Sequence, residues 1–239
     1  MKTLKEAWTL MKMEYKLTPP SLIGVLFMIT VALFFVLTSV TSPEDQRTIG
    51  TEVIFFLIVI GFPYMIRARS LQPQKFGKNH VSQIVIFLQT MPISKRSIAM
   101  YRMLLYTCIA IIFNSIFFSI LYAFSPYMRS IATPGTYIVF AIMWICFAIY
   151  AGGYQINMEA GYHLLTYIFF IFLIWFPIFM IASTVLFYKD LYEQGLIQWL
   201  LDISEAYPFI VISVSIILAI LGFAFHMRGF IKRMERTDY

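Results

Sequence analysis

Six long apolar runs set the limits on what this chain can fold into. They cover residues 21–41, 49–66, 98–124, 136–154, 162–187 and 206–230. An α-helix needs about 20 mainly apolar residues to cross the hydrocarbon core of a bilayer. In lipid, only helices and closed barrels satisfy their own backbone groups, and these runs do not alternate as barrel strands do. We therefore predict an all-α, multi-pass membrane protein with six transmembrane helices in one domain, residues 1–239.

Lysine and arginine residues gather in alternate loops between the runs. Of the 18, four lie in the first 17 residues, seven between 67 and 102, and four after residue 227. The other three, Arg47, Arg129 and Lys189, lie one each in the intervening loops, which also carry six acids. Cytoplasmic loops keep an excess of lysine and arginine. We therefore predict that both termini and the 67–102 loop lie on the cytoplasmic side.

Two further segments have the pattern of a helix that lies at the membrane surface. Residues 1–17 place on one helical face Leu4, Ala7, Trp8, Met11 and Tyr15. This pattern predicts an amphipathic helix in the inner interface, with its lysines toward anionic headgroups. A disordered basic tail is the alternative. Residues 188–207 predict a short amphipathic helix that dips into the outer interface.

The loop between the second and third runs is a long polar break that contains six basic residues between 67 and 97 and no acid. Apolar residues recur in it at helical spacing: Val81, Ile84, Val85, Leu88 and Met91, with Phe87 beside them. Such a stripe predicts a short helix that lies in a groove of a soluble partner. The alternative is a helix that packs only on lipid or on the spans.

The sequence carries no signature of nucleotide, zinc or serine-hydrolase chemistry. It has no Gly-x-x-x-x-Gly-Lys-Ser/Thr, no Gly-x-Ser-x-Gly and no His-Glu-x-x-His. Glu52 is an acid within a run, and it is placed either to reach the outer interface or to line an outward gate. Asn114 predicts a hydrogen bond between helices. We expect no enzyme activity, no metal or cofactor bound by this chain, and no nucleic-acid partner.

One short stretch resembles a known signature. Residues 87–98 read Phe-Leu-Gln-Thr-Met-Pro-Ile-Ser-Lys-Arg-Ser-Ile, and Tyr101-Arg102 follow. They are similar to Leu-Pro-Ile-Ser-Arg/Lys-x-x-Ile-Val-x-x-Arg/Lys of small bacterial permeases, with Met91 in place of the leucine and Ala99-Met100 in place of Val-x. The expected order of elements also matches: an elbow helix, six spans, a cytoplasmic helix after span two and a re-entrant helix before span six. The chain thus resembles the permease subunit of ABC-2 type ABC transporters.

The resemblance implies a separate ATPase subunit, which holds ATP and Mg²⁺ and docks on the helix before the Pro-Ile-Ser motif, roughly residues 78–89. It assigns coupling to Lys78, His80, Val81, Ile84, Val85, Phe87, Leu88, Met91 and Pro92. We expect a second contact from a short loop, residues 155–161, through Asn157 and Glu159. Relatives work as two permeases with two ATPases, so a second permease copy is expected, as a homodimer or a related heterodimer.

Spans one, two and five usually line the exit path of such permeases. Here they offer Met28, Thr30, Phe34, Phe35, Thr38, Glu52, Phe55, Phe56, Phe62, Met65 and Trp175. A wall of methionine and aromatic side chains suits an amphipathic peptide or a lipid-like cargo, and ordinary lipid-facing aromatics are the alternative. The similarity to subunits that export peptides such as phenol-soluble modulins favours peptide export across a bacterial plasma membrane. A non-transporting membrane enzyme or assembly factor, and an ion-coupled transporter, are the competing functions.

Overall fold

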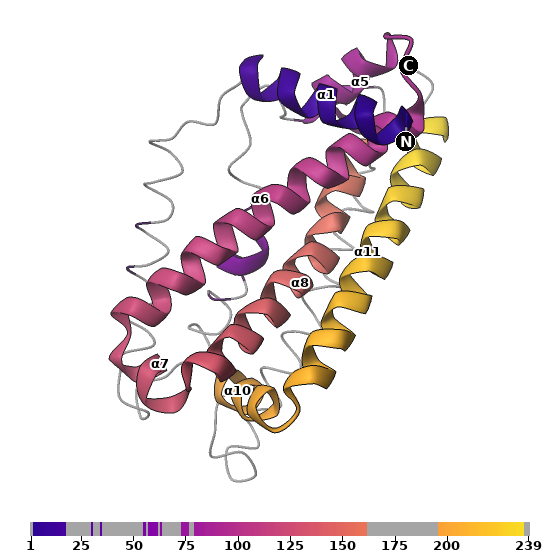
Figure 1. Cartoon of the computed structure of the whole chain (residues 1–239). Coiled ribbons are helices and arrows are strands. Elements are labelled where there is room, and N and C mark those ends of the chain that lie inside the picture. Colours follow the sequence, from indigo (N-terminus) through magenta and orange to yellow (C-terminus); the bar gives the residue numbers. More distant parts are fainter. Residues whose placement is uncertain are drawn as a thin grey trace.

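Three long helices lie side by side in the computed structural model (Figure 1). The structure describes residues 2–17, 30, 34, 55, 57–61, 63, 73–76, 79–161 and 196–236. The three helices are α6 (Lys95–Phe124), α8 (Pro134–Glu159) and α11 (Pro208–Arg236). Each is long and apolar enough to cross a membrane. They match the predicted runs 98–124, 136–154 and 206–230, while the other three runs lie wholly or largely outside the described residues.

Hydroxyl side chains and prolines set where the helices begin. Ser94 accepts a hydrogen bond from the backbone N–H of Ser97 at the start of α6, and Thr133 accepts one from Thr136 at the start of α8. Pro134 follows Thr133 in the first helical position, where its missing N–H has no partner to lose. Ser125 caps the short helix α7 (Pro126–Ile131) in the same way. Local residues, Ser125-Pro126 and Thr133-Pro134, therefore determine where the chain turns between α6 and α8.

The shorter elements lie at the two ends of the bundle (Figure 1). At one end, here called the α1 end, α1 (Lys2–Leu17) lies across the start of α6, near the ends of α8 and α11. At the other end, here called the α10 end, α7 joins α6 to α8 and α10 (Leu196–Ala206) packs on α8. Helices are thus confirmed within the two segments predicted to be amphipathic, residues 1–17 and 188–207.

The segment that precedes α6 is only partly helical. Strands β1 (Pro73–Phe76) and β2 (Asn79–Ser82) form an antiparallel pair in which Pro73 lies opposite Ser82. Helix α5 (Gln83–Gln89) follows directly. The prediction of one helix over residues 78–89 is therefore wrong for residues 79–82, which pair as a strand. Of these four residues only Val81 is apolar, so the helical spacing of the stripe depended there on a single position, and the pairing with β1 makes the segment a strand.

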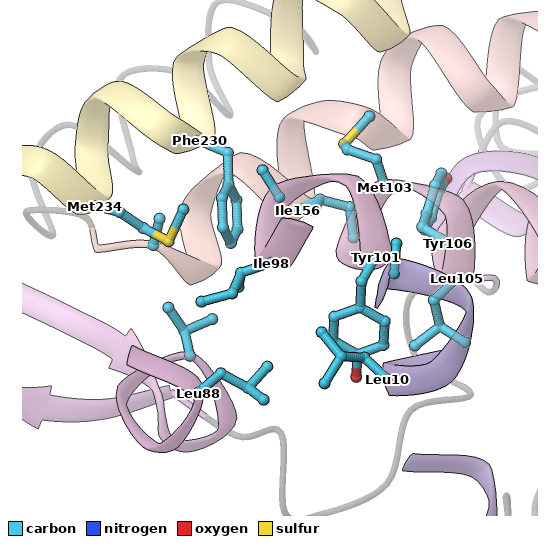
Figure 2. Packing of buried hydrophobic residues seen from close by; sticks show 14 of the residues in the cluster. Leu10, Leu88, Ile98, Tyr101, Met103, Leu105, Tyr106, Ile156, Phe230 and Met234 are labelled. Carbon is cyan, nitrogen blue, oxygen red and sulfur yellow. The ribbon is translucent and has the colours of Figure 1, made fainter. Parts of the chain in front are cut away.

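Two apolar clusters make up the core of the described bundle. The aromatic cluster lies toward the α10 end and includes Phe55, Phe113, Phe117, Phe118, Tyr137, Phe140 and Trp144. The α1-end cluster joins residues of α1, α5, α6, α8 and α11, among them Leu10, Leu88, Ile98, Tyr101, Ile156, Phe230 and Met234 (Figure 2). Each cluster therefore holds several helices together at a different level of the bundle.

Glycines allow α8 and α11 to lie close together. A Cβ on Gly153 of α8 would lie 2.6 Å from the ring of His226, and one on Gly222 of α11 would lie 2.6 Å from the ring of Tyr150. Small residues at such positions are typical of helix pairs in membranes, where close packing rather than water exclusion drives association. The close contact also places Nε2 of His226 3.0 Å from the carbonyl oxygen of Tyr150.

A proline in the second run has its missing hydrogen bond replaced from α6. Leu57–Gly61 form one π-helical turn, η2, shortly before Pro63. Pro63 has no N–H for the carbonyl of Val59, four residues earlier. Asn114 Nδ2 donates to that carbonyl at 3.2 Å. The predicted hydrogen bond between Asn114 and another helix is therefore confirmed, and it satisfies a backbone group that the proline leaves open.

Candidate functional site

Helix α5 has one face against the bundle and one face exposed. Val85 and Leu88 are buried, and Leu88 lies beside Ile98 at the start of α6 (Figure 2). Val81, at the end of β2, is buried with them. On the opposite face Phe87 is 53% exposed. The predicted stripe is thus covered by the chain's own helices at Val81, Val85 and Leu88, so these three do not lie on the face that a partner would meet.

The remaining residues predicted to couple have mixed positions. Ile84 and Met91 are half-buried, and Pro92 is exposed. His80 belongs to β2, and Lys78 lies outside the described residues. Among the residues of this group whose side chains the structure describes, Phe87 is the large apolar side chain with an open face. A role in coupling stays a prediction for all of them.

The expected loop at residues 155–161 is mostly helix. Helix α8 continues to Glu159, and both Asn157 and Glu159 are buried. Gly161, with a φ of 119°, takes the left-handed conformation that ends the helix. The loop prediction is therefore wrong for residues 155–159, because a buried ion pair of Glu159 keeps the last turn of α8 against the bundle.

That ion pair belongs to a group of three charged side chains, here called the Arg102 cluster: Glu14 of α1, Arg102 of α6 and Glu159 of α8. Arg102 has no exposed surface, and both acids are buried. Its Nε donates to Oε2 of Glu159 at 2.7 Å, and Nη2 donates to the same oxygen. Nη1 lies 3.2 Å from both carboxylate oxygens of Glu14 and 3.1 Å from the hydroxyl of Tyr101. One guanidinium therefore bridges three helices.

Two further polar contacts hold the same end of the bundle together. Ser97 Oγ donates to Oε2 of Glu6 at 2.6 Å, which ties the first turn of α6 to α1. Arg233 of α11 donates through Nη1 to the carbonyl of Gly161, just past the end of α8, at 3.2 Å. The α1 end is thus joined by directional hydrogen bonds among α1, α6, α8 and α11.

The sequence reasoning missed the Arg102 cluster because it counted Arg102 with the basic loop. A signal was present: Arg102 lies inside the apolar run 98–124. A charge within an apolar helix is costly in lipid unless it has a partner, so such a residue indicates an acid on a neighbouring helix. The partners Glu14 and Glu159 are distant in sequence, and nothing in their spacing points to Arg102.

The residues predicted to line a translocation path are only partly described. Phe34 is 65% exposed and Thr30 is exposed, whereas Phe55 is 1% exposed. The ring of Phe55 lies 5.1 Å, edge to face, from Trp144 within the aromatic cluster. Phe55 therefore lies in the core between helices and not on an open wall in this structure. Thr38, Glu52, Phe56 and Phe62 lie outside the described residues.

The polar groups of the described site form ion pairs and hydrogen bonds between helices. Within the described residues there is no group of three His, Cys, Asp or Glu side chains that could hold a metal ion. The carboxylates of the Arg102 cluster are already bonded to a guanidinium, which fixes three helices relative to one another. Comparison with known proteins finds no family model, no curated protein and no solved structure that matches this chain.

Proposed function

We propose that this chain is the permease subunit of an ATP-driven ABC exporter of the ABC-2 type. In this proposal the α1 end faces the cytoplasm of a bacterium, and both termini lie there. Six spans cross the plasma membrane, with α1 as the elbow helix and α10 as a re-entrant helix. Two copies of an ATPase subunit, which hold ATP and Mg²⁺, act on two permease copies. The cargo is an amphipathic or hydrophobic peptide.

The exposed face of α5 is the observation that carries the proposal. A phenylalanine that is 53% exposed lies on a helix whose other face is buried against α6. Lys95 and Arg96, at the start of α6, are also exposed. An aromatic side chain with basic neighbours is typical of a protein contact, because a partner buries the ring while the charges select an acidic rim. Because the other face of α5 is packed against α6, the exposed face is already in position before a partner binds.

Copurification with matched variants tests the proposal. The full-length chain is solubilised from its native membrane, and ATP-binding proteins retained on it are identified and quantified. Wild type should retain an ATPase subunit. Phe87→Asp should weaken retention about tenfold or more, because truncation of a residue that dominates an interface costs about 2 kcal/mol or more. Leu4→Asp is the control, since Leu4 is 55% exposed but lies on α1, on a face assigned to lipid.

Three results would count against the proposal. A wild-type chain that purifies alone from its native membrane would remove the need for a motor. Equal retention by Phe87→Asp and Leu4→Asp would remove α5 as the docking element. Uptake into vesicles of the purified chain that follows a proton gradient without ATP would favour an ion-coupled transporter instead.

A further inference from the structure

The fully buried Arg102 is not explained by stability. A buried ion pair loses the hydration of both charges, and apolar residues of similar volume often give an equally stable or more stable protein. The better attested use of buried charges is to fix one arrangement among several that apolar packing would tolerate. Arg102 suits that use, since its planar guanidinium bonds two carboxylates at once, through Nε and Nη2 to Glu159 on α8 and through Nη1 to Glu14 on α1.

The Arg102 cluster lies next to the part of α6 on which α5 packs. Leu88 of α5 packs with Ile98 on the first turn of α6, and Tyr101 follows less than one helical turn later (Figure 2). The hydroxyl of Tyr101 accepts a hydrogen bond from Arg102. Contact therefore runs without a break from α5 through the first turns of α6 to Arg102, and from there to Glu14 and Glu159.

The helices at the α1 end are held by two kinds of contact. Close-packed apolar side chains resist large displacements, although dispersion between them has no preferred direction. Charged hydrogen bonds depend strongly on direction. In the described residues, α1 is tied to α6 by such bonds at two levels, Glu6 to Ser97 and Glu14 to Arg102. α8 is tied to Arg102 at its last residue.

We infer that Arg102 is a positioning residue that holds α1, α6 and α8 as one unit behind α5. A movement imposed on α5 then reaches the α10 end through α6 and α8. The ion pairs prevent α1, α6 and α8 from sliding against one another at the α1 end, so the movement is transmitted. The inference rests on the proposed function, because a docked ATPase supplies the movement. It assigns to Arg102 a role separate from the docking face at Phe87.

The test uses a variant in which the charges are removed together. Arg102→Met with Glu14→Met and Glu159→Met replaces all three buried charges by apolar side chains of similar length, so it leaves no buried charge or side-chain amide without a partner and should insert and fold. Arg228→Met, which removes an exposed arginine from α11, away from the Arg102 cluster and from α5, is the matched control. Each chain is purified with its ATPase subunit in lipid nanodiscs. Hydrogen–deuterium exchange is then measured without nucleotide and with ATP plus vanadate.

The inference expects two changes in the triple variant. Amides of residues 3–14 in α1 should exchange about tenfold faster or more without nucleotide, because local opening no longer breaks the ion pair. The exchange response of α10 to ATP plus vanadate, present in wild type and in Arg228→Met, should be lost although the ATPase stays bound. A purely structural Arg102 would leave that response in place once the variant is folded.

Other outcomes overturn the inference. It fails if α1 exchanges as in wild type, if the α10 response persists, or if the triple variant no longer binds the ATPase. Should the triple variant not fold, Glu14→Gln alone removes the α1 contact and keeps Arg102 paired with Glu159. The same two readouts then decide. If the wild-type chain carries no ATPase, the proposed function has failed, and so has the inferred transmission of movement from α5 to α10. The hydrogen–deuterium exchange of α1 then still decides whether Arg102 positions α1.

Discussion

The two apolar clusters of the bundle are held together by different kinds of contact. In the aromatic cluster, Phe140 lies about 6 Å, edge to face, from both Phe118 and Trp144, and Phe55 packs against the same rings. The α1-end cluster instead surrounds a guanidinium with two carboxylates. Ring contacts tolerate a change of shape, whereas an ion pair in a buried site does not tolerate the loss of one partner. One level of the bundle is therefore adaptable and the other is fixed.

The largest expected effect comes from breaking the fixed level. Arg102→Met alone leaves Glu14 and Glu159 buried without their cation, and should lower the free energy of unfolding by about 3–5 kcal/mol. Unfolding in mixed micelles, followed by circular dichroism, measures this change. The triple variant, in which methionine replaces all three charged side chains, should be about as stable as wild type or more stable. Equal loss in the single and triple variants would show that packing of the side chain, and not its charge, matters.

The adaptable level should be sensitive to volume and tolerant of shape. Phe140→Ala leaves a cavity among aromatic rings and should lower the free energy of unfolding by about 3 kcal/mol. Phe140→Leu, which keeps much of the volume, should cost less than about 1.5 kcal/mol. The same unfolding assay applies. If Phe140→Leu is as damaging as Phe140→Ala, the aromatic cluster depends on ring geometry as strictly as the α1 end depends on charge.

The smallest expected effect tests a single hydrogen bond between the two levels. Asn114→Leu removes the donor to the carbonyl of Val59, and should cost about 0.6 kcal/mol, as such bonds do on average in membranes. A double-mutant cycle with Pro63→Ala isolates it, because alanine restores an N–H near that carbonyl. The cost of Asn114→Leu should largely vanish in the Pro63→Ala background. An unchanged cost would mean that Asn114 acts through some other contact.

Much of the helical framework was predictable, and the side of α5 that is exposed was not. The apolar runs gave α6, α8 and α11 to within six residues at each end, because membrane length and hydrophobicity are properties of the sequence itself. The stripe around Val85 and Leu88 was read correctly as apolar. What covers this apolar stripe depends on tertiary contacts, and in the structure helices of the same chain cover it.

Two of the predicted site residues are buried for the same reason. Phe55 was assigned to a path and Glu159 to a partner, and both are buried against other helices of the same chain. A residue type indicates which contacts a side chain can make, but its neighbours come from segments far apart in sequence. Arg102 is 88 positions from Glu14 and 57 positions from Glu159 in the sequence, so no local pattern relates the three residues.

The sequence by itself determined that long apolar helices exist, where hydroxyl caps and prolines begin them, and which segments are too polar to span. These properties depend on neighbours within a few residues. Only the tertiary structure decided that α1 and α8 meet α6 at one guanidinium, and that α5 turns Phe87 outward. The physical reason is that a buried charge is tolerated only where its partners converge in space, and convergence is a property of the packed bundle.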